Sequence, residues 1–119
     1  MLHKELREQW RAPTPSGFVY YLPNPQGGDP VSYDDCKWTN GIVFEIKGAG
    51  YTKLTSDLPD MMADYLVGQA SRQLEASGGR PVVWIFAEEQ AARFSRKLFD
   101  DTGLGRITVA HVPWIRSGR

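Results

Sequence analysis

Apolar and polar residues alternate along the first half of the chain in a pattern that predicts one helix and several strands. Apolar residues at helical spacing predict a short helix over residues 2–11, which ends at two prolines. Segments 18–22 and 31–33 have strand composition, and the apolar run 42–47 lies between two glycines after an Asn-Gly turn signal. Residues 18–47 are therefore expected to form an antiparallel meander of about three strands.

The second half of the chain predicts two helices that alternate with two strands. A long amphipathic helix is expected over residues 58–77, with Asp57 as its N-cap. The continuous apolar run 81–86 predicts a central strand buried on both faces. A helix over 88–100 and a strand over 106–112 then complete a parallel crossover. The order helix, three strands, helix, strand, helix, strand predicts an α/β fold, an α+β mixed sheet flanked by helices.

Length and composition predict a single domain with a real hydrophobic core. The chain has 119 residues, of which 41% are hydrophobic. Its 14 basic and 14 acidic residues give no net charge, so any nucleic-acid surface must come from local segregation of charge. Arg93, Arg96 and Lys97 cluster in one predicted helix and form either such a surface or an ordinary solvated face.

The content of cysteine, histidine and long apolar runs excludes several classes of protein. Cys36 is the only cysteine, so no intrachain disulfide can form, and with two histidines a Cys/His zinc site is not expected. No apolar run has the length of a membrane span, and the charged N-terminus does not have the pattern of a signal peptide. No membrane partner is expected.

The strand predicted over residues 42–47 carries the candidate chemistry. Alternate residues of a strand share a face, so Glu45 and Lys47 point the same way. With Asp34 they form a set of two acids and one lysine, which suits a hard cation such as Mg²⁺ and a scissile phosphate. Lys47 would orient the attacking water or stabilise the developing negative charge. The alternative is a surface ion pair at the end of a strand, with Asp34 in a solvated turn.

Four further polar residues allow two interpretations each. The apolar stripe of the long predicted helix includes Leu58, Met61 and Tyr65, and two glutamines fall on the same stripe. Gln69 and Gln73 either point into a polar site beside the sheet or stay solvated after a slight rotation of the helix.

His111 and Lys53 are the other two. His111 could contact a phosphate or act as a base, but a hydrogen-bonded histidine near the sheet edge is the commoner arrangement. Lys53 could contact backbone phosphates, and a solvated loop lysine is the simpler interpretation.

The order of elements together with the Asp…Glu-X-Lys set resembles the PD-(D/E)XK nuclease superfamily. The chain is most similar to the restriction endonuclease-fold toxin 5 domain of bacterial polymorphic toxins. The motifs that carry this resemblance are Tyr33-Asp34-Asp35, Phe44-Glu45-Ile46-Lys47-Gly48, Gln69-Ala70-Ser71-Arg72-Gln73, Trp84-Ile85-Phe86-Ala87-Glu88 and Val109-Ala110-His111-Val112-Pro113. Two positions depart from the family pattern: Asp35 replaces the usual glycine, and Ile85 stands where many members have histidine.

The resemblance implies a restriction-endonuclease-like core and a metal-dependent nuclease, with DNA as the favoured substrate. Asp34 and Glu45 would hold Mg²⁺, for which Mn²⁺ can substitute, and Asp35 is the alternative ligand. Lys47 would assist the attacking water, and Gln69 would position Lys47, the water or the substrate backbone.

The resemblance also implies a biological setting. Residues 1–119 would be one nuclease toxin domain, the C-terminal part of a larger secreted effector carried by a system such as type VI secretion. It would act in the cytoplasm of a competing bacterium and be neutralised by a cognate immunity protein. The family position of a further acid falls near Glu5 and Glu8, for which surface solubility is the preferred interpretation. A non-catalytic module of the same fold that binds nucleic acid or protein, and a DNA repair or junction-resolving nuclease, are the alternatives.

Overall fold

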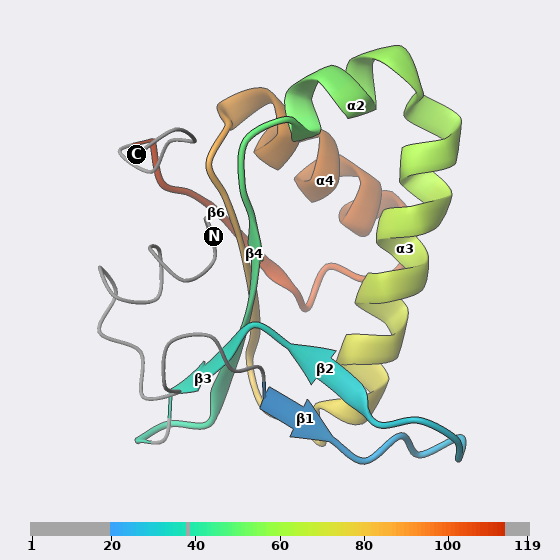
Figure 1. Cartoon of the computed structure of the whole chain (residues 1–119), viewed down its shortest axis with the longest axis vertical. Coiled ribbons are helices and arrows are strands. Elements are labelled where there is room, and N and C mark those ends of the chain that lie inside the picture. The colour runs from blue at the N-terminus through green and yellow to red at the C-terminus, as the bar shows by residue number, and fades with distance from the viewer. Residues whose placement is uncertain (1–19, 38, 114–119) are drawn as a thin grey trace.

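A four-stranded mixed sheet with three helices on one side forms the centre of the computed structural model, which describes residues 20–37 and 39–113 (Figure 1). The sheet has the order β3-β4-β5-β6, and β1 and β2 form a separate antiparallel pair. The elements are β1 Tyr20–Leu22, β2 Val31–Tyr33, β3 Asp35–Lys37, β4 Ile42–Lys47, α2 Tyr51–Asp57, α3 Pro59–Ala76, β5 Val82–Phe86, α4 Glu89–Asp101 and β6 Thr108–His111. The predicted mixed α/β fold is therefore confirmed, while the helix expected over 2–11, with Glu5 and Glu8, lies outside the described residues.

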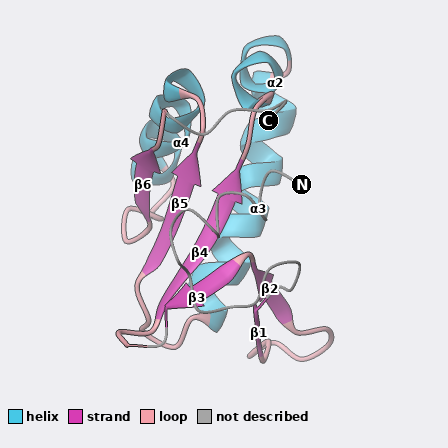
Figure 2. Cartoon of the chain, turned by 60° about the vertical axis from the view of Figure 1, so that its left-hand side comes forward, coloured by secondary structure: helices cyan, strands magenta, loops and turns pink. Residues whose placement is uncertain are grey.

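Strand pairing confirms the predicted parallel crossover and adds a second one. β5 pairs in parallel with β6 through α4, and β4 pairs in parallel with β5 through α2 and α3. Figure 2 shows the four strands side by side with the helices behind them. β5 is the buried central strand that its apolar run predicts, because it has a neighbour on each edge and apolar contacts on both faces.

The predicted meander of three strands is wrong in detail, because the chain forms four short strands in two pieces. β1 pairs with β2, and β3 pairs with β4. Asp34 separates the two pieces: its backbone N–H donates to Phe44 O, and its carboxylate accepts from Ile46 N–H at 2.6 Å. A side chain thus takes the hydrogen bond that a continuing strand would have made.

The long helix expected over 58–77 is confirmed as α3, Pro59–Ala76, but its predicted N-cap is wrong. The chain already forms α2 before it, and Asp57 ends α2 instead of capping α3. Leu58 lies between the two helices with φ −134° and ψ 60°. A residue before proline is pushed out of the helical region, and Pro59 then fits the first turn of a new helix. Pro59 therefore splits one helical stretch into two.

The core lies mainly between the sheet and the helices. The face of α3 that packs on the sheet carries Met62, Leu66, Ala70 and Gln73. Leu58, Met61 and Tyr65, which belong to the predicted apolar stripe of α3, are exposed. The buried face is thus rotated relative to the prediction, and Gln73 takes a place in the core. No helix of the described segments is long and apolar enough to cross a membrane.

Candidate functional site

Glu45 and Lys47 of β4 meet Gln69 and Gln73 of α3 in one buried polar cluster. Lys47 Nζ lies 3.0 Å from Glu45 Oε2 and donates to Gln69 Oε1 at 2.6 Å. Glu45 Oε2 also accepts from Gln69 Nε2 at 3.0 Å, and Glu45 Oε1 accepts from Gln73 Nε2 at 2.8 Å. Glu45 and Lys47 lie on the same face of β4 because residues i and i+2 of a strand share a face. Gln69 and Gln73 lie on the same face of α3 because residues i and i+4 of a helix share a face. The interpretation of the glutamines as part of a polar site is confirmed.

The orientation of both glutamine amides follows from partners that can only donate. An ammonium has no acceptor, so Lys47 requires the amide oxygen of Gln69, and the Nε2 group of Gln69 then faces Glu45. An indole N–H likewise only donates, and Trp84 Nε1 lies 2.9 Å from Gln73 Oε1. Gln73 Nε2 therefore faces Glu45 as well. The carboxylate of Glu45 is held by three donors from two elements.

Burial distinguishes this cluster from a surface ion pair. Glu45 is 5% exposed and Lys47 is 2% exposed. Three aromatic rings surround the ammonium, with centroids 5.3 Å away for Tyr51, 5.4 Å for Tyr65 and 5.0 Å for Trp84. Each ring presents a negative face that attracts the cation once water is excluded. The alternative of an exposed pair at the end of a strand is therefore wrong.

The buried charges change the acid–base properties of both residues. Burial raises the pKa of the Glu45 carboxyl, and the negative charge of Asp34 raises it further, against the opposing effect of Lys47 and Gln73. Burial alone would lower the pKa of Lys47, but the charge of Glu45, with the smaller effect of Tyr51, raises it above its ordinary value. Lys47 is therefore a cation at neutral pH, suited to stabilising negative charge and unsuited to taking up a proton.

The two aspartates before β4 face different sides of the sheet. Asp34 lies next to β4 through its hydrogen bonds with Phe44 and Ile46, and its charge acts on Glu45. Asp35 pairs in register with Phe44, and directly opposite residues of an antiparallel pair share a face. Phe44 points away from Glu45, because neighbouring residues of a strand alternate. The geometry therefore favours Asp34 over Asp35 as the partner of Glu45, and the alternative assignment of Asp35 is not supported.

The carboxylates fit a loosely held hard cation more closely than a dedicated metal cage. In the two described ranges no group of three or more His, Cys, Asp or Glu side chains could hold a metal. Mg²⁺ keeps several of its waters and binds through one or two carboxylates, which Asp34 and Glu45 can supply. The charge of Asp34 raises the pKa of Glu45, and a divalent cation would offset this repulsion. The donor set therefore fits Mg²⁺ coordinated in part by water.

An opening of about 290 Å³ leads from the surface to the two glutamines. Its walls come from the loop between β1 and β2, from β2 and from α3. The lining residues are Asn24, Asp29, Pro30, Val31, Ser32, Tyr65, Gln69, Arg72 and Gln73. Gln69 is half-buried, so it lies between this opening and the buried ion pair. A substrate that reaches the cluster through this opening meets Gln69 first.

His111 and Lys53 are not brought to the cluster. His111 lies on β6, two strands from Lys47, a separation of roughly 10 Å along the sheet. Lys53 lies on α2 and pairs with Asp57 at 2.7 Å, so it is neither a loop lysine nor part of the cluster.

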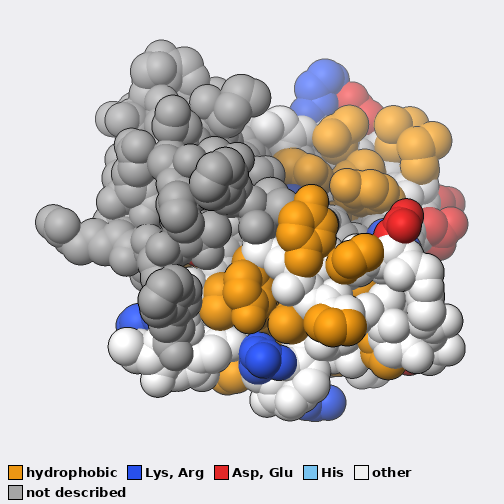
Figure 3. Space-filling view, turned by 60° about the horizontal axis from the view of Figure 1, so that its bottom comes forward, with side chains coloured by type: hydrophobic (Ala, Val, Ile, Leu, Met, Phe, Trp, Pro, Cys, Tyr) orange, Lys and Arg blue, Asp and Glu red, His pale blue; other side chains and the backbone are white. Residues whose placement is uncertain are grey.

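The basic residues of α4 are engaged locally and form no separate basic surface. Arg93 pairs with Glu89 at 2.6 Å, Lys97 pairs with Asp101 at 2.9 Å, and Arg96 donates to a backbone carbonyl of β6. The hydrogen bond and charge of Arg93 lower the pKa of Glu89. On the face that Figure 3 brings forward, hydrophobic side chains gather across the middle, and the few basic side chains of the described segments are dispersed and form no patch. The interpretation of this cluster as a solvated face is therefore favoured.

Four residues of the site have roles that the sequence does not predict. Trp84 orients Gln73, and Tyr51 and Tyr65 lie beside Lys47. Glu88 Oε1 accepts from the backbone N–H groups of Gly50 and Thr52 and so holds the first turn of α2 against the end of β4. Tyr65 precedes Gln69 by one helical turn, and Trp84 and Glu88 belong to one of the resemblance motifs, but neither signal specifies these contacts.

Comparisons of this chain with protein-family models, curated proteins and solved structures found no match. The geometry of the cluster and the motifs of the sequence therefore carry the functional conclusion.

Proposed function

We propose that this domain is a Mg²⁺-dependent nuclease that cleaves phosphodiester bonds, with DNA as the favoured substrate. The observation that carries the proposal is the buried Lys47 cation held between the Glu45 carboxylate and the Gln69 amide, beside the charge of Asp34. This arrangement lies at the inner end of an opening to the surface. It combines ligands for a hard cation with a fixed positive charge, as phosphoryl chemistry requires.

Each residue of the cluster has a role in this proposal. Asp34 and Glu45 would hold Mg²⁺, and Mn²⁺ can substitute. When bound, the metal would neutralise charge and lower the pKa of a coordinated water. Lys47 stabilises negative charge that develops on the phosphate, because its raised pKa keeps it cationic. Gln69 fixes the Lys47 ammonium and is the first group of the cluster that a substrate meets.

The energetic cost of burial supports a functional role over a purely structural one. Buried ion pairs are often replaced by apolar residues with no loss of stability, or with a gain of about 1–4 kcal/mol. Glu45 and Lys47 lie on the main core face, where Val43 of the same strand packs with apolar neighbours. An apolar pair at these positions would serve packing alone.

The same proposal covers the fold family and the biological setting. We infer a restriction-endonuclease-like core, because a strand bearing Glu-X-Lys lies beside a helix bearing two glutamines in a mixed sheet. The domain would be the toxin end of a larger secreted effector that acts in the cytoplasm of a target cell and is neutralised by an immunity protein. Toxicity on expression, relieved by the product of a neighbouring gene, would distinguish this setting from a DNA repair or junction-resolving enzyme.

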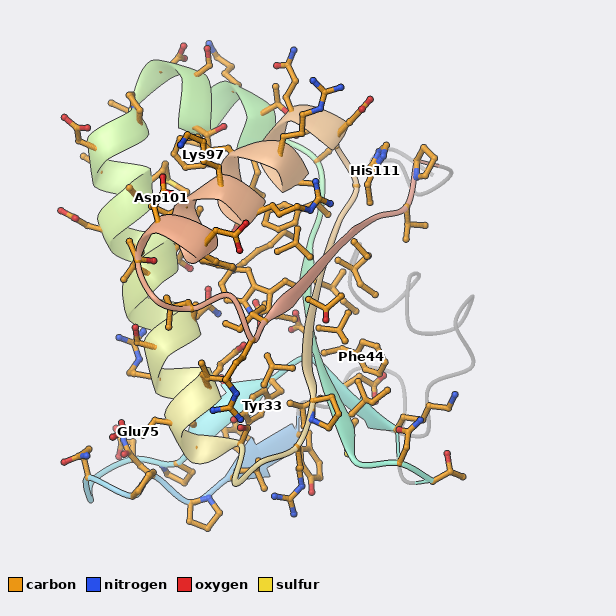
Figure 4. The ribbon with its side chains drawn as sticks, turned by 180° about the vertical axis from the view of Figure 1, so that it is seen from behind. Tyr33, Phe44, Glu75, Lys97, Asp101 and His111 are labelled. Carbon is orange, nitrogen blue, oxygen red and sulfur yellow. The ribbon has the colours of Figure 1, made fainter. Side chains whose placement is uncertain are left out.

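The test is degradation of plasmid DNA and of single-stranded DNA with Mg²⁺, with Mn²⁺ or with EDTA, and cleavage of either substrate counts. Replacing Glu45 alone leaves a buried lysine without its carboxylate and costs about 3–5 kcal/mol, so loss of activity would not be separable from unfolding. The double variant Glu45→Gln/Lys47→Met removes both charges together. Its matched control is Lys97→Met/Asp101→Asn, which removes an exposed ion pair of α4 (Figure 4).

The proposal expects metal-dependent cleavage by the wild type and by the control, and none by the cluster variant while its circular dichroism stays native. Cleavage that survives in a folded cluster variant, or that resists EDTA, would overturn it.

The second candidate is a non-catalytic protein-binding module, which the exposed apolar residues Leu54, Leu58 and Met61 favour. Intact DNA and RNA after incubation with folded wild-type protein and Mg²⁺ would support that candidate.

A further inference from the structure

The opening above the cluster has a wall with a regular arrangement of side chains. Tyr65, Gln69 and Arg72 line it, and their spacing of four and three residues places them along one face of α3. The order along the helix is an aromatic ring, the amide that holds the proposed catalytic lysine, and a guanidinium.

The two ends of this row are available to a ligand. Tyr65 is 51% exposed, although its ring also lies 5.4 Å from Lys47 Nζ. Arg72 is exposed and forms no ion pair with the side chains that the structure describes. Gly68 lies between them on the same face, and a Cβ added there would lie 3.4 Å from Arg72 Nη1. The lack of a side chain at Gly68 therefore leaves the path between the ring and the guanidinium open.

The depth of the cluster restricts which nucleic acids can reach it. Lys47 and Glu45 are nearly inaccessible, and the opening of about 290 Å³ is at the lower end of the range for small-molecule pockets. A duplex is stiff over roughly 150 base pairs and presents its phosphates on the outside of a cylinder. An unpaired strand can instead turn a base away from its neighbours and bring its backbone into a narrow opening.

Resting on the proposed nuclease function, we propose that this opening selects single-stranded nucleic acid. An unpaired base stacks on the ring of Tyr65, and a phosphate of the same strand pairs with Arg72. The strand thus runs along α3 with its backbone at Gln69. Aromatic stacking accepts every base, and the guanidinium contacts only phosphate, so the selection is for an unpaired strand and not for a sequence.

Asp29 is the acidic residue on the wall of the opening that faces α3, and its charge affects where a phosphate can bind. Its charge repels a phosphate on the side of the β1–β2 loop. The phosphates are therefore expected on the α3 side, at Arg72.

Binding is measured in EDTA, where a metal-dependent enzyme leaves its substrate intact. The probes are fluorescein-labelled oligo-dT, oligo-U and a blunt DNA hairpin closed by a non-nucleotide linker, so that every base of the hairpin is paired, and binding is followed by fluorescence anisotropy. The test variants are Tyr65→Ala, Tyr65→Phe and Arg72→Gln. The controls are Met61→Ala, which truncates an exposed side chain one turn away on the same helix, and Arg106→Gln, which removes an exposed charge from the loop before β6.

The expected result is tighter binding of the single strands than of the hairpin. Tyr65→Ala should weaken single-strand binding by roughly 5- to 100-fold, and Tyr65→Phe should retain it. Arg72→Gln should lower the slope of log K against log salt by about 0.7, the value for one phosphate contact on a single strand. Met61→Ala and Arg106→Gln should change neither quantity. Oligo-dT and oligo-U should differ if the 2′-hydroxyl is read, and binding of either one satisfies the proposal.

The outcomes separate this inference from the function on which it rests. Equal binding of hairpin and single strands, or full single-strand affinity in Tyr65→Ala, would overturn the inference even if plasmid cleavage is observed. Selective binding of single strands by a protein that cleaves nothing would support the inference and overturn the nuclease.

Discussion

Replacing Gln73 by methionine removes three hydrogen bonds from the interior while keeping the side chain close to its original volume. Trp84 Nε1–H loses its acceptor, and Glu45 Oε1 and Ser32 O lose a donor. A buried N–H without an acceptor costs about 1–3 kcal/mol, and the lost hydrogen bond to a carboxylate costs about 1.5–3 kcal/mol. The expected destabilisation is about 3–5 kcal/mol, a large part of the 5–15 kcal/mol typical of a domain.

Gln69→Met is the matched control for this prediction. Gln69 contacts the same carboxylate but is half-buried at the opening, so water can replace its amide. Lys47 keeps its ion pair with Glu45, and Glu45 keeps its hydrogen bond from Gln73. We expect Gln69→Met to cost about 0.5–1.5 kcal/mol, the value of an ordinary hydrogen bond.

Urea unfolding followed by tryptophan fluorescence measures both variants, since Trp84 is fully buried beside Gln73. Gln73→Met should also lower the melting temperature by roughly 10–20 °C. Two results would refute the reasoning: equal destabilisation by the two variants, or a loss below about 1 kcal/mol in Gln73→Met. Either would mean that water reaches the inner glutamine as readily as the outer one.

Three further predictions concern pH, metal and thiol chemistry. Burial raises the pKa of Tyr33 from 10.0 to about 12, so this group contributes its full stabilisation below pH 10.0 and loses it as pH rises to 12. The loss is on the order of 3 kcal/mol, and urea unfolding across this range should show it in the wild type and not in Tyr33→Phe. Mg²⁺ at 100 times its dissociation constant should stabilise the protein by about 2.7 kcal/mol, and thermal melts should show no such shift in EDTA or in Asp34→Asn. Cys36 is buried, and burial raises the pKa of its thiol, so its reaction with a disulfide reagent should require unfolding. Rapid reaction of the folded protein would contradict this expectation.

Periodicity alone predicts the parts of the site that lie within one element. The alternation along β4 places Glu45 and Lys47 on one face, and the helical spacing places Gln69 beside Gln73. These predictions hold because one buried face fixes the register of each element. The choice between a polar site and solvated glutamines stays open in the sequence, since it depends on what faces the helix.

The features that the sequence does not predict depend on contacts between elements. The face on which Asp35 lies depends on its pairing with Phe44, and a shift of one residue would reverse it. The first turn of α2 is held by Glu88, an acceptor far away along the chain, so no capping residue next to the helix predicts it. The break at Leu58 is an exception, because the restriction on a residue before proline is visible in the sequence.

The hydrogen bonds that assemble the cluster join residues far apart along the chain. Tyr33 and the carbonyl of Gln73 are separated by 40 residues, and Glu45 and Gln73 by 28. Contacts of such separation form after long loops close, and so later than helices and hairpins. A nascent or partly folded chain, with its local elements already formed, therefore lacks the arrangement around Lys47. The cluster, and with it the activity proposed above, is therefore complete only in the fully folded chain.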